Sequence, residues 1–322
     1  MSIRPAPSSR SGFTLVELVM VVALLAMIAA LAVNRLSGLR ADSADKLNLA
    51  NLSRVANIVD AYAIANEAIP NRLDSLFACD LPSGTAGSFD AAGSASSFLP
   101  RFSDANTGLH PDLTNAVSYY GHAFVPLLGT YFLSAAEAEA LRRAGLVYLM
   151  RATDGDHLRS GDDHAWAPDT STNSPDAVSC VATALTNASP VAIVNPFAVS
   201  ADIQPAGPSV YQACGEDVVF GKDFNVYVDG VAHSSNADAL AALRSGPGLL
   251  LAFGLGQYAS IVGASRSGLA DAPVSPALPS SRYRRYILLF RLVSGPSSAT
   301  VEFAGVMDPR GRTAAALRAA AK

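Results

Sequence analysis

The chain carries little charge and no strong bias toward either sign. Its 322 residues include 23 lysines and arginines against 27 aspartates and glutamates, so the formal net charge is −4 and charged residues make up only 16% of the chain. Proteins that bind nucleic acids usually have a basic surplus, and this composition gives no support to that class. A low charged fraction is typical of a secreted or surface protein whose loops are neutral.

Cysteine is also scarce, with only Cys79, Cys180 and Cys214 in the chain. None of these is part of a C-x-x-C motif, so a zinc ribbon or a thioredoxin-type redox site has no support. The sequence contains no G-x-S-x-G nucleophile elbow. The Gly-Leu-Gly segment at 254–256 lacks the third glycine and the lysine of nucleotide-binding loops. We therefore expect that the protein is not an enzyme.

The first forty residues, by contrast, hold a distinctive arrangement. The chain begins with a polar leader that contains two arginines. A run of sixteen residues without a polar side chain lies further on, at 18–33. A helix over the 21 residues 13–33 would be about 30 Å long, enough to cross the hydrocarbon core of a membrane. Between the leader and the apolar run lie Gly12, Phe13, Thr14, Leu15 and Glu17.

This arrangement resembles the class III leader of type IV pilins and type II secretion pseudopilins. The resemblance implies that a prepilin peptidase cuts between Gly12 and Phe13 and methylates the new amino group on Phe13. It also implies that Glu17 pairs with the N-terminal amine of a neighbouring subunit during assembly. The implied partners are other pilin or pseudopilin subunits, the prepilin peptidase and an inner-membrane assembly platform.

The position of Glu17 agrees with such a role on physical grounds. A carboxylate in hydrocarbon costs on the order of a few kcal/mol and therefore needs a partner or a function. A buried carboxylate and a buried ammonium neutralise each other only when they meet, so the pair would set the axial register of the subunits. The simpler alternative is that Glu17 lies at the membrane interface, where the helix N-terminus favours an anion.

An ordinary secretory signal peptide is the rival interpretation of the same segment. The leader supplies the positive charges, Arg4 and Arg10, and Ala30-Leu31-Ala32 fits the small-x-small rule for cleavage. Cleavage after Ala32 would release a soluble enzyme or binding module. Glu17 speaks against this alternative, because a signal peptide gains nothing from a charge at the head of its apolar run.

The pilin-like interpretation divides the chain into a leader (1–12), a transmembrane assembly helix (13–36), an amphipathic continuation (37–69) and a head domain (70–322). The basic leader predicts that the N-terminus stays in the cytoplasm. The head would then lie in the periplasm of a bacterium, or on a cell-surface filament. A disulfide is allowed there. Cys180 and Cys214 could close a loop, and the odd count leaves Cys79 free or available for an intermolecular bond.

A single long helix is expected from about Phe13 to about Ala68. Helical spacing of apolar residues continues beyond the membrane-length run, and Pro70 ends it. The expected fold is α+β, with this helix packed on an antiparallel β-sheet head that carries large loop insertions. The apolar residues that recur at three- and four-residue intervals are Val55, Ile58, Tyr62, Ala65 and Ile69.

The rest of the head is predicted from helix-capping residues, glycines and the alternation of apolar and polar residues. Ser134 and Glu137 form a capping box for a helix that Gly145 ends. The segment 69–77 resembles the turn that tucks under the sheet after the helix in pseudopilins. Serine-, glycine- and alanine-rich stretches at 80–108, 167–189 and 265–281 are expected to be loop insertions. The expected helices are 134–143, 235–244 and 313–321, and the expected strands are 146–150, 249–253, 285–293 and 299–306, the last two as a hairpin.

The densest group of metal-type ligands lies between 154 and 164. Carboxylates and glycines could wrap calcium there, although the spacing is not that of an EF-hand, and a solvated acidic turn is the alternative. Zinc through His157 and His164 is disfavoured, because the Ser-Gly-Asp segment at 160–162 argues against the helix that would align both rings. The candidate calcium ligands are Asp154, Asp156, Asp162 and Asp163.

Two further segments have more than one interpretation. The alternating segment 223–230 predicts a strand that ends in an Asp-Gly turn, with a second calcium loop as the alternative. The basic and aromatic residues at 282–286 predict a strand entry or a subunit contact. A nucleic-acid site is the alternative for that second segment, and we expect no nucleic-acid partner.

Overall fold

A computed structural model provides the structure of the chain. Contacts within it divide the chain into two compact units, Met1–Lys46 and Leu47–Lys322. The structure describes residues 15–77, 82–90, 109, 113, 118–119, 122–123, 127–150, 182–194, 218–220, 226–228, 231–233, 236–263, 269–276, 278, 283–295 and 298–320.

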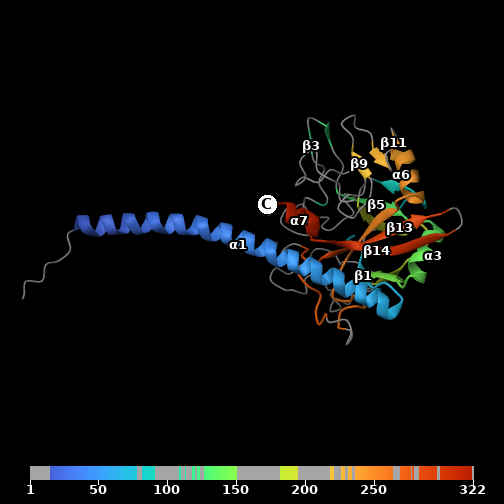
Figure 1. Cartoon of the computed structure of the whole chain (residues 1–322), viewed down its shortest axis with the longest axis horizontal. Coiled ribbons are helices and arrows are strands. Elements are labelled where there is room, and N and C mark those ends of the chain that lie inside the picture. Colours follow the sequence, from blue (N-terminus) through green and yellow to red (C-terminus); the bar gives the residue numbers. More distant parts are fainter. Residues whose placement is uncertain are drawn as a thin grey trace, which may run out of the picture. The chain divides into compact units, whose positions relative to one another are not determined.

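The predicted long helix is present as α1, Leu15–Asn66, which has 52 residues. It ends where Glu67 takes a positive φ of 51°, three residues before Pro70, which cannot continue a helix. In its second half, buried residues recur at intervals of four, three and four: Asn48, Leu52, Val55 and Val59. Leu52, Val55 and Val59 belong to the same buried cluster as residues of the sheet. Figure 1 shows this end of α1 running along the head.

The described residues of the head include one sheet of nine strands. Its path is β2-β5-β8-β12-β1-β6-β7, and β13 pairs with β12 while β14 pairs with β13. All neighbours are antiparallel except β1 and β6. The strands are β1 Leu73–Asp74, β2 Phe89–Asp90, β5 Leu128–Phe132, β6 Tyr148–Met150, β7 Ala182–Ala184, β8 Pro190–Val194, β12 Leu249–Gly254, β13 Ile287–Ser294 and β14 Ala299–Met307.

Two smaller sheets lie outside this path. The first contains β9 Val218–Phe220, β10 Val226–Val228 and β11 Val231–His233, and the second pairs β3 Ser118–Tyr119 with β4 His122–Ala123. In the first sheet, Val228 pairs with Val231. The predicted strand is therefore present at 226–228, and the predicted Asp-Gly turn at 229–230 lies outside the described residues.

The predicted helices of the head are α3 Ala135–Arg143, α6 Asn236–Ser245 and α7 Ala314–Ala320. Both halves of the predicted capping box of α3 form, between Ser134 and Glu137. Gly145 follows with a φ of 109°, a value at which a side chain would be strained. The buried Glu137 carboxylate also accepts hydrogen bonds from Tyr131 and Arg244.

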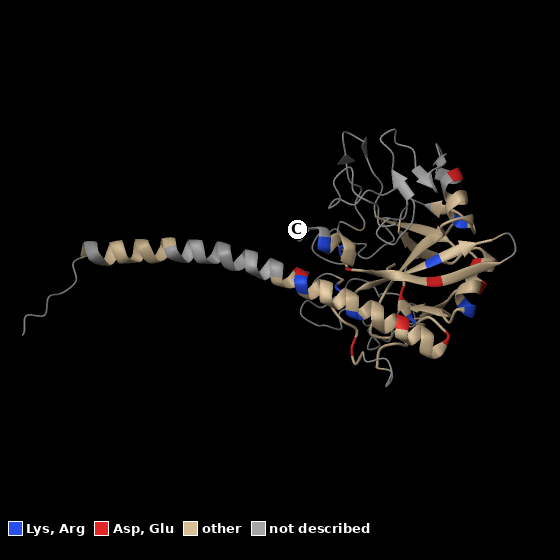
Figure 2. Ribbon diagram, viewed as in Figure 1, with Lys and Arg blue, Asp and Glu red and all other residues tan. Residues whose placement is uncertain are grey.

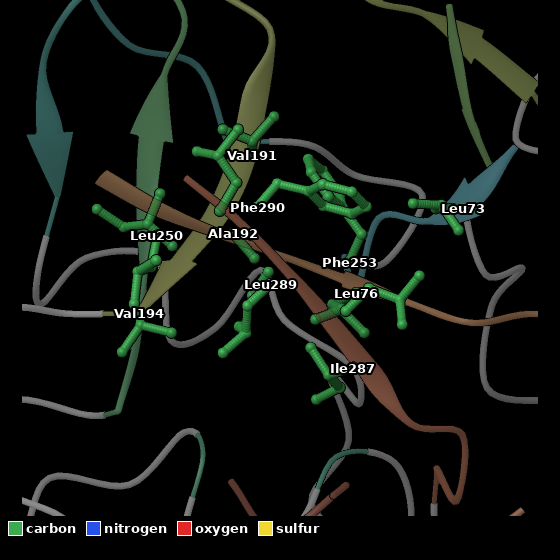
Figure 3. Close-up of a cluster of buried hydrophobic side chains, with 14 of the residues drawn as sticks. Leu73, Leu76, Val191, Ala192, Val194, Leu250, Phe253, Ile287, Leu289 and Phe290 are labelled. Atoms are coloured by element: carbon green, nitrogen blue, oxygen red, sulfur yellow. The ribbon is translucent and has the colours of Figure 1, made fainter. Parts of the chain in front are cut away.

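The core lies around β12 and β13. All six residues of β12 are buried, and so are the first four of β13. The rings of Phe253 and Phe290 lie 6.1 Å apart between centroids. Figure 3 shows side chains from β8, β12, β13 and the segment after α1 gathering in this cluster.

Two predictions about connecting segments were wrong. The segment after α1 does not tuck under the sheet, because its strand β1 lies inside the sheet between β12 and β6. The expected insertions contain ordered pieces: β2 lies in the first and β7 in the second. In the third, Leu269 and Ala272 are buried and Val274 bridges to Arg285.

Candidate functional site

The first half of α1 presents apolar side chains to its surroundings. Leu15 is 79% exposed, Met20 69% and Met27 68%. In Figure 2, the ribbon of the described residues 18–27 has the colour of uncharged residues. Such a continuous apolar surface is characteristic of a site that another apolar partner covers.

The predicted processing and register residues belong to this end of the chain. Gly12 and Phe13 lie outside the described residues. The backbone of Glu17 lies in the first turn of α1, and its side chain is outside the described part. The roles given to these three residues therefore stay predictions.

The second half of α1 is held in the head by a buried polar cluster around Asn48. The Asn48 side chain donates from Nδ2 to Oδ2 of Asp308 at 2.8 Å. Its Oδ1 accepts from the hydroxyl of Tyr286 at 2.8 Å and from that of Ser275 at 3.2 Å. Asn48, Asp308 and Ser275 are all fully buried, so each of these hydrogen bonds replaces water that cannot reach the group.

Asp308 is the first residue after β14, and its carboxylate holds the loop that follows. It accepts from Nε of Arg312 at 2.9 Å, with both side chains largely buried. The backbone N–H groups of Arg310 and Arg312 donate to its other oxygen, Oδ1. Burial raises the pKa of the neighbouring Tyr286 to about 12, so this hydroxyl stays protonated and serves as a donor.

A second set of hydrogen bonds fixes the end of α1. The hydroxyl of Tyr62 lies 3.0 Å from that of Ser260, which also accepts from the backbone N–H of Asn71. The side-chain oxygen of Asn71 in turn accepts from the N–H groups of Val147 and Tyr148. Both ends of the buried helical segment are therefore tied to strands or loops from distant parts of the chain.

Asp74 is a partly buried residue that the sequence did not single out. The hydroxyl of Tyr283 donates to its Oδ2 at 2.9 Å. Burial raises the pKa of Asp74 to about 7, although the hydrogen bond from Tyr283 and the charge of Arg285 act in the opposite direction.

The two glycines at the end of β12 make room for this pair. A Cβ at Gly254 would overlap the Tyr283 hydroxyl, and one at Gly256 would overlap the Asp74 carboxyl group. The Gly-Leu-Gly segment at 254–256 is thus explained by packing around Asp74. This agrees with the weak support that the sequence gave to a nucleotide loop.

The basic and aromatic residues at 282–286 do not form an aromatic surface. Tyr283 and Tyr286 have no exposed area, and Arg285 is only 7% exposed. Arg285 forms a bridge with Val274 just before β13 begins at Ile287. The described residues of this group therefore belong to a strand entry, one of the two structures predicted for it.

A cavity of about 560 Å³ lies beside α1 in the head. Its wall combines apolar groups with two arginines and one aspartate, and Gln257 donates to that aspartate, Asp271, at 3.1 Å. The lining residues include Asn51, Arg54, Gln257, Asp271, Val274 and Arg285.

The predicted calcium ligands Asp154, Asp156, Asp162 and Asp163, and the cysteines 79, 180 and 214, all lie outside the described residues. Within the part of the chain that the structure describes, no group of three or more histidine, cysteine, aspartate or glutamate side chains could hold a metal ion. Calcium binding and the Cys180–Cys214 disulfide therefore stay predictions. A chelator should lower the melting temperature of the protein if the calcium prediction is right.

Comparison with known proteins bears on the N-terminus. Residues 7–33 match the family model described as the prokaryotic N-terminal methylation motif. The chain carries a prepilin-type methylation motif. This match confirms the resemblance of the N-terminal segment to that of type IV pilin-like proteins and pseudopilins, and it supports processing by a prepilin peptidase.

The methylation motif covers residues 7–12 of the leader, Glu17 and the apolar run of α1 as far as Val33. No curated protein and no solved structure matches the chain. Among the described residues, no helix combines the length and the apolar content that a membrane crossing requires.

Proposed function

We propose that this protein is a pilin-like or pseudopilin subunit. Prepilin peptidase cleaves it after Gly12, and the mature chain assembles through the first half of α1 into a type II secretion pseudopilus or a type IV pilus-like filament. The prepilin-type methylation motif at 7–33 is the observation that carries this proposal.

The exposure of the first half of α1 supports assembly through this segment. Leu18, Val22 and Leu25 are 61%, 58% and 60% exposed, and they lie at intervals of four and three on the helix. Burial of apolar area contributes roughly 25 cal/mol per Å². Packing of such helices against one another would therefore stabilise the proposed filament without contacts between the heads.

Glu17 gives the proposed filament its register. Apolar packing alone allows neighbouring helices to slide, because leucine, valine and methionine tolerate many alignments. A carboxylate among these side chains is stable only when the amine on Phe13 of a neighbour reaches it. One axial offset between subunits then becomes more stable than the others.

The same proposal assigns the protein a structural role in place of catalysis. The leader lies in the cytoplasm, the first half of α1 anchors the chain in the inner membrane before assembly, and the head lies in the periplasm. The Asn48 cluster supports this role, because it joins the helix to the head through buried hydrogen bonds.

The N-terminal sequence and mass of the protein recovered from its native host test the proposal. A chain that begins with N-methylated Phe13 is the expected result. A Gly12→Asp variant should keep its leader, because a bulky charged side chain at the cut hinders the peptidase, and a Ser11→Ala variant is the control that should be processed normally. A mature chain that begins at Val33 would show cleavage by signal peptidase and overturn the proposal.

A further inference from the structure

The cavity beside the second half of α1 has the size of a small-molecule site. Its volume of about 560 Å³ lies within the roughly 300–1,000 Å³ that such sites usually have. Its lining comes from the helix, from the loop after β12 and from the segment 269–274, with Arg285 just before β13. These residues all belong to the unit Leu47–Lys322. The cavity is therefore a feature of one compact unit.

One wall of the cavity is held in place by side chains from other parts of the chain. Gln257 donates from Nε2 to Oδ1 of Asp271 at 3.1 Å, and its Oε1 accepts from the backbone N–H of Ala272 at 3.0 Å. Arg285 donates to the carbonyl oxygen of Ala272 and forms a bridge with Val274. The wall therefore has its shape before a ligand arrives, and a preformed site loses less conformational freedom on binding.

The inner and outer parts of the lining differ in exposure. Val55, Leu269 and Arg285 are buried, whereas Arg54 and Asp271 are exposed. The cavity thus has an apolar floor that contains one arginine. It opens to solvent beside the other arginine and the aspartate.

The described residues of the lining carry a surplus of positive charge. Arg54 and Arg285 contribute two positive charges, and Asp271 contributes one negative charge. Asp74 lies close enough to feel the charge of Arg285, but burial raises the pKa of its carboxyl group to about 7, so near neutral pH it neutralises the arginine only in part. The planar fork of a guanidinium matches the two oxygens of an anion such as a carboxylate. The cavity therefore favours an anion.

The buried floor favours a carboxylate over a phosphate. A phosphate group carries more negative charge near neutral pH than a carboxylate does, and a buried charge is costly unless it is paired. Arg285, the one arginine at the floor, balances a single negative charge. The side chains of Val55 and Leu269 can cover an apolar body that is attached to the carboxylate.

We propose that this cavity binds a small carboxylate with an apolar body. The carboxylate accepts hydrogen bonds from Arg285 at the floor, and the apolar body lies against Val55 and Leu269. The rest of the ligand reaches the opening between Arg54 and Asp271. This inference does not depend on how the N-terminus is processed, because the lining residues all belong to the unit that begins at Leu47.

The test uses the full chain in detergent micelles with two probes, 3-phenylpropionate and its neutral counterpart 3-phenylpropanamide. Isothermal titration calorimetry gives the Kd of each probe, after subtraction of a titration into micelles without protein. The carboxylate should bind about tenfold more tightly than the amide, because hydrogen bonds to a charged acceptor are stronger. It should also slow hydrogen–deuterium exchange of the backbone amides of 269–274.

Two variants locate the binding in the cavity. Arg54→Gln removes the positive charge at the opening and should weaken binding of the carboxylate about threefold, with little change for the amide. Arg285→Lys keeps the charge at the floor but loses the planar fork, and should weaken binding of the carboxylate about tenfold. Circular dichroism checks that both variants fold. Arg143→Gln removes the same charge from an exposed side chain of α3 outside the cavity and is the matched control.

A loss of carboxylate affinity in either folded variant that Arg143→Gln does not share supports the proposal. Equal affinity for the carboxylate and the amide would overturn it. So would a Kd that neither variant changes. Inorganic phosphate that binds more tightly than 3-phenylpropionate would also overturn it, because the site would then recognise charge without an apolar body.

Discussion

The two halves of α1 are built from similar apolar residues but lie in opposite surroundings. Leu18 and Leu25 in the first half are 61% and 60% exposed, whereas Leu52 and Val59 in the second half are 1% and 0% exposed. The second half is covered by the sheet of its own chain. The described side chains of the first half are exposed, and in the proposed filament neighbouring subunits cover them.

The pattern of residues explains this division. In the first half, residues 18–33 are apolar on every side of the helix, which is typical of a helix surrounded by apolar material. In the second half, the buried positions 48, 52, 55 and 59 form one stripe, and Arg54, Asn57 and Asp60 lie outside it. One sheet can cover a single apolar stripe, but it cannot cover a helix that is apolar on every side.

The largest expected effect comes from Glu17→Val in the first half. Removing the carboxylate removes the proposed register contact, so filaments should be lost while cleavage after Gly12 continues. Electron microscopy of sheared cell-surface material and the N-terminal mass measure the two outcomes separately. Asp60→Val, at an exposed site in the second half, is the control that should still assemble. Normal filaments in Glu17→Val would remove the register role.

A matched pair of truncations tests the difference in burial directly. Leu52→Ala leaves a cavity in the core and should lower the free energy of unfolding by about 2–5 kcal/mol. Leu18→Ala should change it by less than about 0.5 kcal/mol, because that side chain is exposed in the isolated subunit. Urea denaturation of both variants in detergent measures the contrast. Equal losses would mean that the two halves do not differ in the way described.

Asp74, at the start of the sheet just after α1, should make stability depend on pH. Its folded pKa of about 7 lies above the ordinary aspartate value of 3.8, so between these values the folded state binds more protons than the unfolded state. Its contribution is therefore fully present below about pH 4 and is lost as pH rises through 7, by an amount on the order of a few kcal/mol.

Asp74→Asn should remove this dependence, because asparagine keeps an oxygen for the Tyr283 hydroxyl and carries no charge. The difference in unfolding free energy between variant and parent, measured from pH 5 to 8, should grow with pH in favour of the variant. Hydrogen bonds from Ser294 and Ser134 and the charge of Arg244 outweigh burial and lower the pKa of Glu137. Glu137 therefore makes stability change with pH in the opposite direction. Because variant and parent both contain Glu137, its contribution cancels in the difference between them. A constant difference would show that Asp74 does not titrate in this range.

The smallest of these effects is expected at Asn48. Asn48→Ala removes the partner of Asp308 and of the Tyr286 hydroxyl, both buried, and should lower the free energy of unfolding by about 1–3 kcal/mol. Asn57→Ala, on the exposed side of α1, should have almost no effect. Thermal unfolding followed by circular dichroism compares the two, and similar melting temperatures would rule out an anchoring role for Asn48.

Local sequence cues predicted much of this fold. The spacing of apolar residues predicted α1, Ser134 and Glu137 predicted the start of α3, and the alternation around Val301 and Phe303 predicted the β13–β14 hairpin. Each of these features depends on residues within a few positions of one another. The methylation motif was also evident from adjacent residues, which is why Gly12, Phe13 and Glu17 could be named without a structure.

The features that sequence analysis missed depend on distant partners or unusual backbone. Arg72 and Leu76 flank β1 with positive φ values of 57° and 65°, and nothing in these residue types predicts that. Asp74 becomes unusual only in the folded chain, where burial raises its pKa to about 7 and its hydrogen-bond partner Tyr283 comes from 209 residues away. Asn48 did offer a cue, because it lies four residues before Leu52 on the buried stripe, where a polar residue requires a partner.

The separation of Asn48 and Asp308 along the chain has a consequence for the order of folding. The two side chains that meet in the head are 260 residues apart, and the buried cluster that contains Leu52 and Val59 includes residues of β12 and β13. The ribosome makes the helix first and its covering last. The apolar stripe of α1 is therefore exposed during most of synthesis, because the strands of the sheet are made later. The head folds late and as one unit. A chaperone that holds this stripe in the meantime would protect the chain from aggregation.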